Sequence, residues 1–256
     1  MSEKHSDDAV SEVIAFMLIF AMIVVFLASW VIFYVPSEGH NVEIKHDEEV
    51  LRQFSDIKTG VDLLWTADRK TSIDRLVSLS PTKGTDISTL LFLSPSLGSG
   101  TIKIGGGTSF SFNDTKYNEI IKINGDVHNV SLMRISYTSF NEYSDDFTIV
   151  YDGGAVFYGN TEGDQYLLGS PIMGGGKLYL VNVSSPKEEI ILGNFPVSVK
   201  ITYKGASDPI EVYDKKFYNV TSDYFDYWNN NILNTSVTNI QYVTILEYEI
   251  DVRVSP

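Results

Sequence analysis

The stretch that decides the fold is VIAFMLIFAMIVVFLASWVIFYV, Val13 to Val35, which is 23 residues without a charged side chain. As an α-helix rising about 1.5 Å per residue it extends over about 34 Å, slightly more than the ~30 Å hydrocarbon core of a bilayer. In lipid, only a helix satisfies its own backbone over this length. Trp30 and Tyr34 suit the headgroup layer, and Pro36 is expected to end the helix. We therefore predict a membrane-spanning helix over residues 10–35.

The residues before this run, MSEKHSDDAVSE, argue against a conventional secretory signal. Such a signal begins with a positively charged region, whereas Lys4 stands here as the one lysine or arginine among four acidic residues. No small-x-small cleavage site follows the apolar run. The apolar helix is therefore expected to stay on the mature chain.

Asp8-Ala9-Val10-Ser11-Glu12, followed by the apolar run, resembles the class III signal peptide of archaeal type IV pilin-like proteins. In that family a charged residue and a Gly or Ala precede the cut. The resemblance thus implies that a prepilin-type peptidase cleaves between Ala9 and Val10 and releases residues 1–9 as a leader. Two positions depart from the family pattern: Asp8 stands where a basic residue is usual, and Ala15 where Gly is usual.

Glu12 has a structural and a functional interpretation. A carboxylate in the first turn of a helix is stabilised by the helix macrodipole, by about 0.3–1 kcal/mol when it is exposed. The resemblance to pilins implies instead that Glu12 pairs with the N-terminal amine of a neighbouring subunit. It would be the third residue after the cut, whereas the acidic residue of bacterial pilins is the fifth.

The orientation of the span has indicators on both sides. Lys45 and Arg52 follow the span while Lys4 alone precedes it, so the positive-inside rule favours a cytoplasmic location for the downstream part. The resemblance implies the opposite, because the family's peptidase acts at the cytoplasmic face and the head is exported. Export is also favoured by five Asn-x-Ser/Thr acceptors of N-glycosylation downstream of the span. These are Asn113, Asn129, Asn182, Asn219 and Asn234.

After the span, the sequence predicts an amphipathic helical stem over residues 36–74. Its helix is expected from about His46 to Ala67, because apolar residues recur there at spacings of four, three, four and three. The stripe consists of Val50, Phe54, Ile57, Val61 and Leu64.

Residues 75–256 are predicted to form one β-rich domain, because short β-type runs alternate there with Gly, Asn and Asp. Three hairpins are expected, at Thr101–Phe112, Glu119–Val130 and Phe147–Tyr158, with turns at Gly105–Gly107, Asn124-Gly125 and Asp152-Gly153. Further strands are expected at Lys177–Val183, Val197–Tyr203, Ile210–Tyr213 and Val243–Val254, and a short helix at Ser222–Asn231. The predicted fold class is α+β, with two helical segments before a mainly antiparallel head that could be a sandwich.

Composition restricts the function. The chain has 256 residues, a net charge of −14 and no cysteine. This charge opposes binding to a phosphate backbone, and the absence of cysteine excludes disulfides, thiolate metal sites and cysteine nucleophiles. We therefore expect no nucleic-acid partner.

No pattern for catalysis or cofactor binding is evident. His40, Glu43 and Asp47 are spaced for one helical face, but Pro36 and Gly39 argue against a helix there, so no metal is predicted. Gly174–Lys177 lacks the Ser or Thr that a phosphate loop needs after its lysine. The segment 160–164 is too short for an EF-hand calcium loop. The expected protein is not an enzyme and has no catalytic residue or cofactor.

These features predict a membrane-anchored, extracellular pilin-like surface protein, with a role as a minor filament subunit in adhesion or surface attachment. Its expected partners are the membrane, the prepilin-type peptidase and identical or related pilin-like subunits contacted through the apolar helix. The alternative is a single-span cell-surface binding module that does not polymerise. A third hypothesis is an exported glycan-cleaving enzyme that uses a carboxylate pair from Asp145, Asp146, Asp223 and Asp226.

Overall fold

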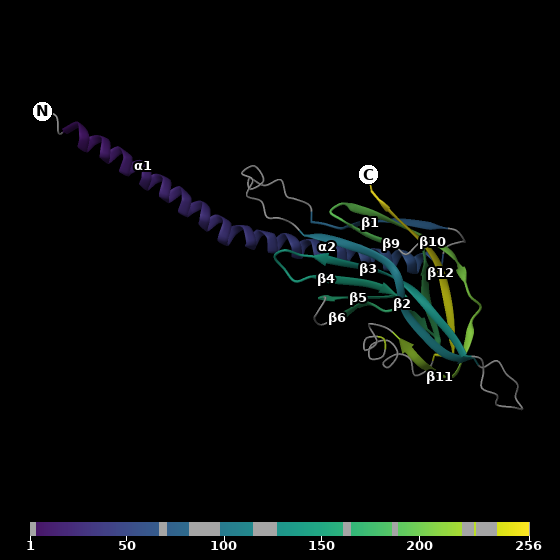
Figure 1. The fold of residues 1–256 in the computed structure, drawn as a ribbon. Coiled ribbons are helices and arrows are strands. Elements are labelled where there is room, and N and C mark those ends of the chain that lie inside the picture. Colours follow the sequence, from purple (N-terminus) through teal and green to yellow (C-terminus); the bar gives the residue numbers. More distant parts are fainter. Residues whose placement is uncertain are drawn as a thin grey trace, which may run out of the picture.

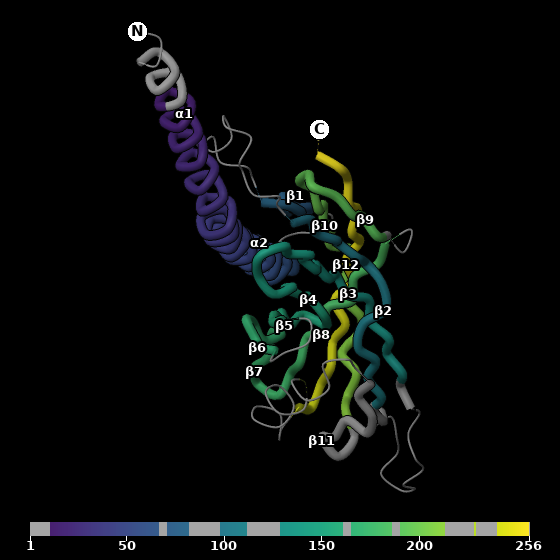
Figure 2. The backbone as a smooth tube through the Cα atoms, turned by 60° about the vertical axis from the view of Figure 1, so that its left-hand side comes forward, coloured from purple at the N-terminus to yellow at the C-terminus, as the bar shows by residue number. Residues whose placement is uncertain are grey.

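The computed structural model describes residues 4–66, 71–81, 98–114, 127–160, 165–185, 189–221, 228 and 240–255. A long N-terminal helix projects from a β-rich head, and its second half lies along the strands (Figure 1). Viewed from another side, the strands curve around this second half (Figure 2). The predicted α+β fold with a mainly antiparallel head is confirmed.

The helix runs without a break through α1 (Lys4–Ser29), the π-helical turn η1 (Trp30–Tyr34) and α2 (Val35–Leu64). The expectation that Pro36 ends the helix is wrong. In η1 the ladder widens, and the Val35 N–H donates to the Trp30 carbonyl five residues earlier. Pro36 therefore falls in the first turn of α2, where its missing N–H and fixed φ are tolerated.

The amphipathic helix is longer than predicted at its start and slightly shorter at its end. It begins at Val35 rather than near His46 and ends at Leu64 rather than Ala67. The first strand begins at Ser72, inside the stretch assigned to the stem. The predicted apolar stripe is confirmed, because all five of its side chains are buried.

In the part of the chain that the structure describes, twelve strands form two sheets that share one strand. The first sheet contains β1 (Ser72–Ser78), β7 (Ile172–Gly174), β8 (Lys177–Ser184), β10 (Pro196–Ala206) and β12 (Tyr242–Val254). The second contains β2 (Ser99–Asp114), β3 (Val127–Phe140), β4 (Phe147–Asp152), β5 (Ala155–Asn160), β6 (Gln165–Gly169) and β9 (Glu189–Gly193). The shared strand β11 (Ile210–Thr221) pairs with β12 and with β2. Within the described part, β8 and β12 make the one parallel pair.

The hairpin expected at Phe147–Tyr158 is confirmed as β4 and β5. Its turn residues are Gly153 (φ 61°) and Gly154 (φ 94°), one position later than predicted. The four further strands are also confirmed as β8, β10, β11 and β12. The turn of the Glu119–Val130 hairpin and nearly all of the helix expected at Ser222–Asn231 lie outside the described residues.

The hairpin expected at Thr101–Phe112 is wrong, because these residues lie in the single long strand β2. The glycine run forms a bulge there, with a register shift between Gly106 and Ser109. The bulge brings the chain against the buried Asp152, whose carboxylate accepts a 2.6 Å bond from Thr108 Oγ1 and bonds from the Thr108 N–H. A Cβ at Gly107 would lie 2.6 Å from Asp152 Oδ1. The glycines therefore allow β2 to approach Asp152 closely and do not form the expected turn.

The main core lies between α2 and both sheets. The buried face of α2 contacts a cluster with members on β1, β2, β3, β4, β5, β8, β10 and β12. A second cluster forms where Trp228 packs edge-on against Phe110 and Phe157. The head is therefore two sheets wrapped on a helix rather than a sandwich with only sheets at its centre.

Candidate membrane anchor and its junction with the head

The apolar run predicted to span a membrane stands free of the head. Its large side chains are exposed along the whole of Val13–Tyr34 apart from Trp30, with Phe16 at 70% and Phe33 at 73%. Within the described part, this is the one helix long and apolar enough to cross a membrane, and no residue of its apolar window is buried by the protein. So large an apolar surface needs a cover that the head does not provide.

An aromatic cluster marks the downstream end of this exposed segment. The rings of Trp30 and Tyr34 stack with centroids 4.0 Å apart, and Phe26 lies 6.4 Å from Trp30 on the preceding turn. The indole Nε1–H of Trp30 has no acceptor among the described residues. Trp and Tyr with a polar atom to satisfy are typical of the layer between hydrocarbon and water.

The predicted processing residues lie in the first turns of α1. Asp8, Ala9 and Val10 have helical backbones, and their side chains lie outside the described set. Glu12 is exposed on the same helix, one residue before the apolar run. Both the processing and the pairing of Glu12 with another subunit stay predictions.

The helix enters the head four residues after the apolar run, at Gly39, which is the first buried residue of α2. At about 1.5 Å per residue this is a rise of about 6 Å. A Cβ at Gly39 would lie 2.3 Å from Cδ2 of Tyr143, so only glycine allows this ring to lie on the helix backbone. At the next residue, His40 Nδ1 lies 3.1 Å from the carbonyl oxygen of the same Tyr143.

Glu43 is the centre of this junction. Its carboxylate is fully buried and accepts four hydrogen bonds from the loop between β3 and β4. The N–H groups of Glu142, Tyr143 and Ser144 donate at 2.7, 2.8 and 2.9 Å, and Ser144 Oγ donates at 3.1 Å. Hydrogen bonds to a charged acceptor are about twice as strong as neutral ones. The bonds replace the water that the carboxylate loses, and they fix this loop on α2.

The next helical turn carries two titratable groups with opposite pKa shifts. Burial lowers the pKa of His46 to about 4, although the nearby Glu43 charge opposes this, and His46 Nε2 lies 3.1 Å from the Tyr137 hydroxyl. Burial also raises the pKa of Asp47 to about 7, against the effect of the bond that Asn141 Nδ2 donates to it. The junction is therefore least strained electrostatically when both side chains are neutral.

His40, Glu43 and Asp47 do share one helical face, contrary to the expectation that Pro36 and Gly39 prevent a helix there. Each of them bonds to the loop 141–146. Among the described residues, no three His, Asp or Glu side chains are arranged to hold a metal ion. The face is thus occupied by protein contacts.

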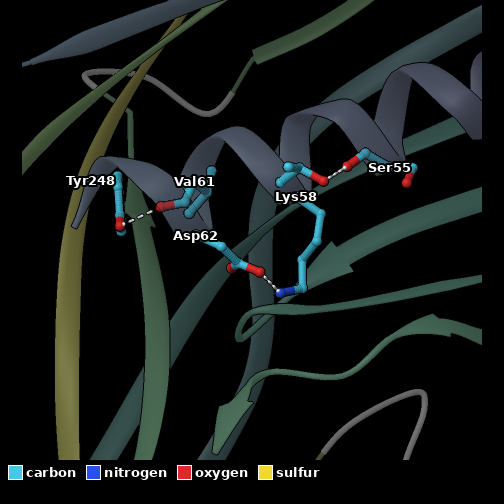
Figure 3. Close-up of polar contacts among 6 residues, drawn as sticks. Ser55, Lys58, Val61, Asp62 and Tyr248 are labelled. Carbon is cyan, nitrogen blue, oxygen red and sulfur yellow. Dashed lines mark hydrogen bonds and ion pairs between the residues drawn. The ribbon is translucent and has the colours of Figure 1, made fainter. Parts of the chain in front are cut away.

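The far end of α2 is held by a partly buried polar pair and a tyrosine (Figure 3). Lys58 reaches along the helix to pair with Asp62, and burial raises the pKa of Asp62 against the opposing effect of Lys58. From β12, the Tyr248 hydroxyl donates a 2.9 Å bond to the Val61 carbonyl. Val61 belongs to the last turn, where helix carbonyls lack intrahelical donors, so Tyr248 satisfies one of them.

The predicted glycosylation acceptors have different environments. Asn129 is exposed on β3, whereas Asn182 on β8 is partly buried between the sheets. Asn113 and Asn219 lie in β2 and β11 with side chains outside the described set, and Asn234 lies outside it altogether. Asp145 of the proposed carboxylate pair accepts a 3.3 Å bond from Asn160, while Asp223 and Asp226 lie outside the described residues.

The sequence patterns did not predict the hydrogen bonds that the β3–β4 loop donates to Glu43. They also did not predict that Asn182 links β8 to β3 and β12. Neither depends on spacing along the chain, because the partners are about 50 to 100 residues apart. The chain matches no protein-family model, no curated protein and no solved structure. What the fold defines is a β-rich head on an N-terminal helix that is suited to cross a membrane.

Proposed function

We propose that this protein is a membrane-anchored surface protein of the archaeal pilin-like class, with its head outside the cell. The observation that carries the proposal is the unbroken helix from Lys4 to Leu64, exposed and apolar in its first half and buried in the head in its second. Such a helix fits a bilayer and can later fit a bundle of like helices. The cleavage-type sequence at Asp8–Val10 adds support from the resemblance.

In this proposal the peptidase removes residues 1–9 and the subunit then joins a filament as a minor component in attachment. Withdrawing the apolar helix from lipid costs about 0.8 kcal/mol for each CH₂ that becomes exposed. Burial against equivalent helices offsets that cost, so filament partners are needed. After the cut, Glu12 is the third residue and lies close to the new amine of a neighbouring chain.

A permanently anchored surface binding module is the second candidate. It is favoured by the stacked pair Trp30 and Tyr34, since this aromatic pair suits a lasting position at the headgroup layer. In this case the helix stays in the bilayer and the head alone acts.

Mass spectrometry of the N-terminus of the native protein tests the processing step. A chain that begins at Val10 supports the pilin-like proposal, and Ala9→Leu should then accumulate uncut chain while Ala21→Leu, within the span, should not. A chain that begins at Met1 contradicts processing. One that begins beyond Val35 contradicts the anchor itself.

Fractionation separates the two candidates. Shearing intact cells should release the processed protein with filaments if it polymerises, whereas the anchored module should stay with the envelope. Protease treatment of intact cells tests the location of the head. Complete protection of the head, with cleavage after lysis, would overturn both candidates.

A further inference from the structure

Asn129 has the geometry of an accessible modification site. It begins the tripeptide Asn129-Val130-Ser131, and both Asn129 and Ser131 are exposed. Residues two apart on a strand point to the same face, so the amide and the hydroxyl of the acceptor sequence face solvent together. Ser111 Oγ donates a 2.7 Å bond to Asn129 Oδ1, which leaves Nδ2, the atom that a glycan would modify, outside that bond.

The backbone around Asn129 is also open on one side. β3 pairs with β2 from Val127 to Phe140, whereas its pairing with β4 covers only residues 134–138. The edge of β3 near Asn129 thus has no partner strand within the described part. The end of β2 and the start of β3, where Asn129 lies opposite Ser111, are at the end of the head that carries β11, away from α1 (Figure 1). A transferase can approach Asn129 there without meeting the membrane.

Asn182 carries the same kind of tripeptide, Asn182-Val183-Ser184, in the opposite situation. Its Nδ2 donates to both carboxylate oxygens of Glu247, at 3.0 and 3.3 Å, and its Oδ1 accepts a 3.2 Å bond from the Met133 N–H. Both sequence-motif hydroxyls are bonded, since Ser184 Oγ donates a 3.0 Å bond to the Tyr248 carbonyl and Ser131 Oγ accepts one of 3.0 Å from Ser109, so the difference lies in the two asparagine amides. β8 is paired with β7 and β12. Asn182 therefore joins β8, β12 and β3, and both its Nδ2 and its Oδ1 are hydrogen-bonded within the protein.

From this contrast we infer that Asn129 is an N-glycosylation site of the folded protein and that Asn182 is not. The donor is an oligosaccharide linked through C1 to a polyprenyl phosphate or diphosphate. Asn129 Nδ2 forms a bond to C1, the bond between C1 and the phosphate oxygen breaks, and the lipid phosphate leaves with the bonding pair. Nδ2 loses one proton to the transferase base, so the side chain remains an uncharged amide.

Modification in the cell rests on the proposed export of the head, but the difference between the two sites does not. The deciding experiment is glycosylation in vitro of the folded full-length chain, in detergent micelles, by an oligosaccharyltransferase with a lipid-linked oligosaccharide. Glycopeptide mass spectrometry then gives the occupancy of each site. We expect at least about tenfold more glycan at Asn129, since Asn182 must first break several hydrogen bonds.

Matched variants and an unfolded substrate complete the test. Ser131→Ala should abolish the glycan at Asn129, and Ser184→Ala should leave it unchanged. In urea-unfolded chain captured on beads and returned to buffer, or in peptides spanning each site, both asparagines should react to similar extents. Equal occupancy of the two sites in the folded chain, or an unmodified Asn129, overturns the inference. Glycopeptides from native cells, together with protease accessibility of the head, tell a failure of export from a failure of the site.

Discussion

Glu43 of α2 accepts a 2.7 Å hydrogen bond from the backbone N–H of Glu142, which lies 99 positions later in the chain. The bond joins the helix, just after it leaves its exposed apolar half, to a loop of the second sheet. Because the carboxylate is fully buried, it relies on the loop for its hydrogen bonds, and the loop's N–H groups rely on the carboxylate as their acceptor. The junction between the apolar segment and the head thus centres on Glu43 and this loop, and His40 and Asp47 add further bonds to the same loop.

Replacing Glu43 should destabilise the head strongly. Glu43→Ala leaves three loop N–H groups and the Ser144 hydroxyl without their acceptor, and we expect a loss of about 3 kcal/mol or more. Glu43→Gln, which keeps one acceptor oxygen, should lose less. Urea unfolding of the full chain in micelles, followed by circular dichroism, measures this. Glu48→Ala, at an exposed position of the same helix, is the control; an equal effect of both variants would contradict the assignment.

A methyl group at residue 39 should displace Tyr143. The added Cβ of Gly39→Ala would lie 2.3 Å from the ring, and such overpacking typically costs about 1–3 kcal/mol. The better helix propensity of alanine offsets up to about 1 kcal/mol of that loss. Gly106→Ala, whose Cβ meets nothing within 4 Å, is the matched control. If Tyr143→Ala does not relieve the defect of Gly39→Ala, the clash is not its cause.

The raised pKa of Asp47 should make stability depend on pH. Burial raises this pKa from 3.8 to about 7, so the folded state binds the proton more tightly than the unfolded state. Stability from this group is complete below about pH 4 and is lost as the pH rises through about 7. The free energy of unfolding of the native chain, minus that of Asp47→Asn, should therefore fall between these values. A flat difference would contradict the shift.

His46 should act in the opposite sense on the acidic side. Burial lowers its pKa from 6.5 to about 4, so its contribution is complete above about pH 6.5 and is lost as the pH falls through about 4. NMR titration of the His46 ring resonances gives the pKa directly. His40, an exposed histidine of the same helix, serves as the internal comparison, and a midpoint for His46 near 6.5 would refute the prediction.

Tyr248→Phe should weaken the hold on the end of α2. The variant removes the donor to the Val61 carbonyl and keeps the ring, so we expect a loss of about 1 kcal/mol. Hydrogen exchange should rise in the last turn of α2 before it rises elsewhere in the helix. Tyr166→Phe, at a tyrosine that is 52% exposed, should change neither quantity.

Local patterns predicted the parts of the fold that local chemistry decides. The stripe from Val50 to Leu64 needed only helical periodicity and burial, and the β4–β5 hairpin needed only glycines that accept a positive φ. The predictions based on the glycine run 105–107 and on Pro36, a turn and a helix end, were wrong for a common reason. Gly107 serves a close approach to Asp152, and Pro36 is accommodated by the widened turn before it. Both facts depend on geometry that the sequence does not display.

The junction was beyond prediction for a related reason. An acidic residue on a helix is ordinarily solvated, and nothing near Glu43 in the sequence indicates that a loop about 100 residues away will bury it. The same holds for Asn182, whose acceptor tripeptide suggests exposure while its amide bonds to Met133 and Glu247. Tertiary contacts decide whether Glu43 is solvated or buried, and whether the Asn182 amide is exposed or hydrogen-bonded inside the protein.

The passage from α1 through η1 into α2 is continuous helix, so in the proposed membrane-anchored protein the helix can act as a lever. α2 has 30 residues, or about 45 Å of helix. When the rod leans in the bilayer by about 20°, a common inclination for spanning helices, its far end swings sideways by about 15 Å. In that proposal, a force that pulls on the strands reaches the apolar segment as torque, because continuous helix connects the two.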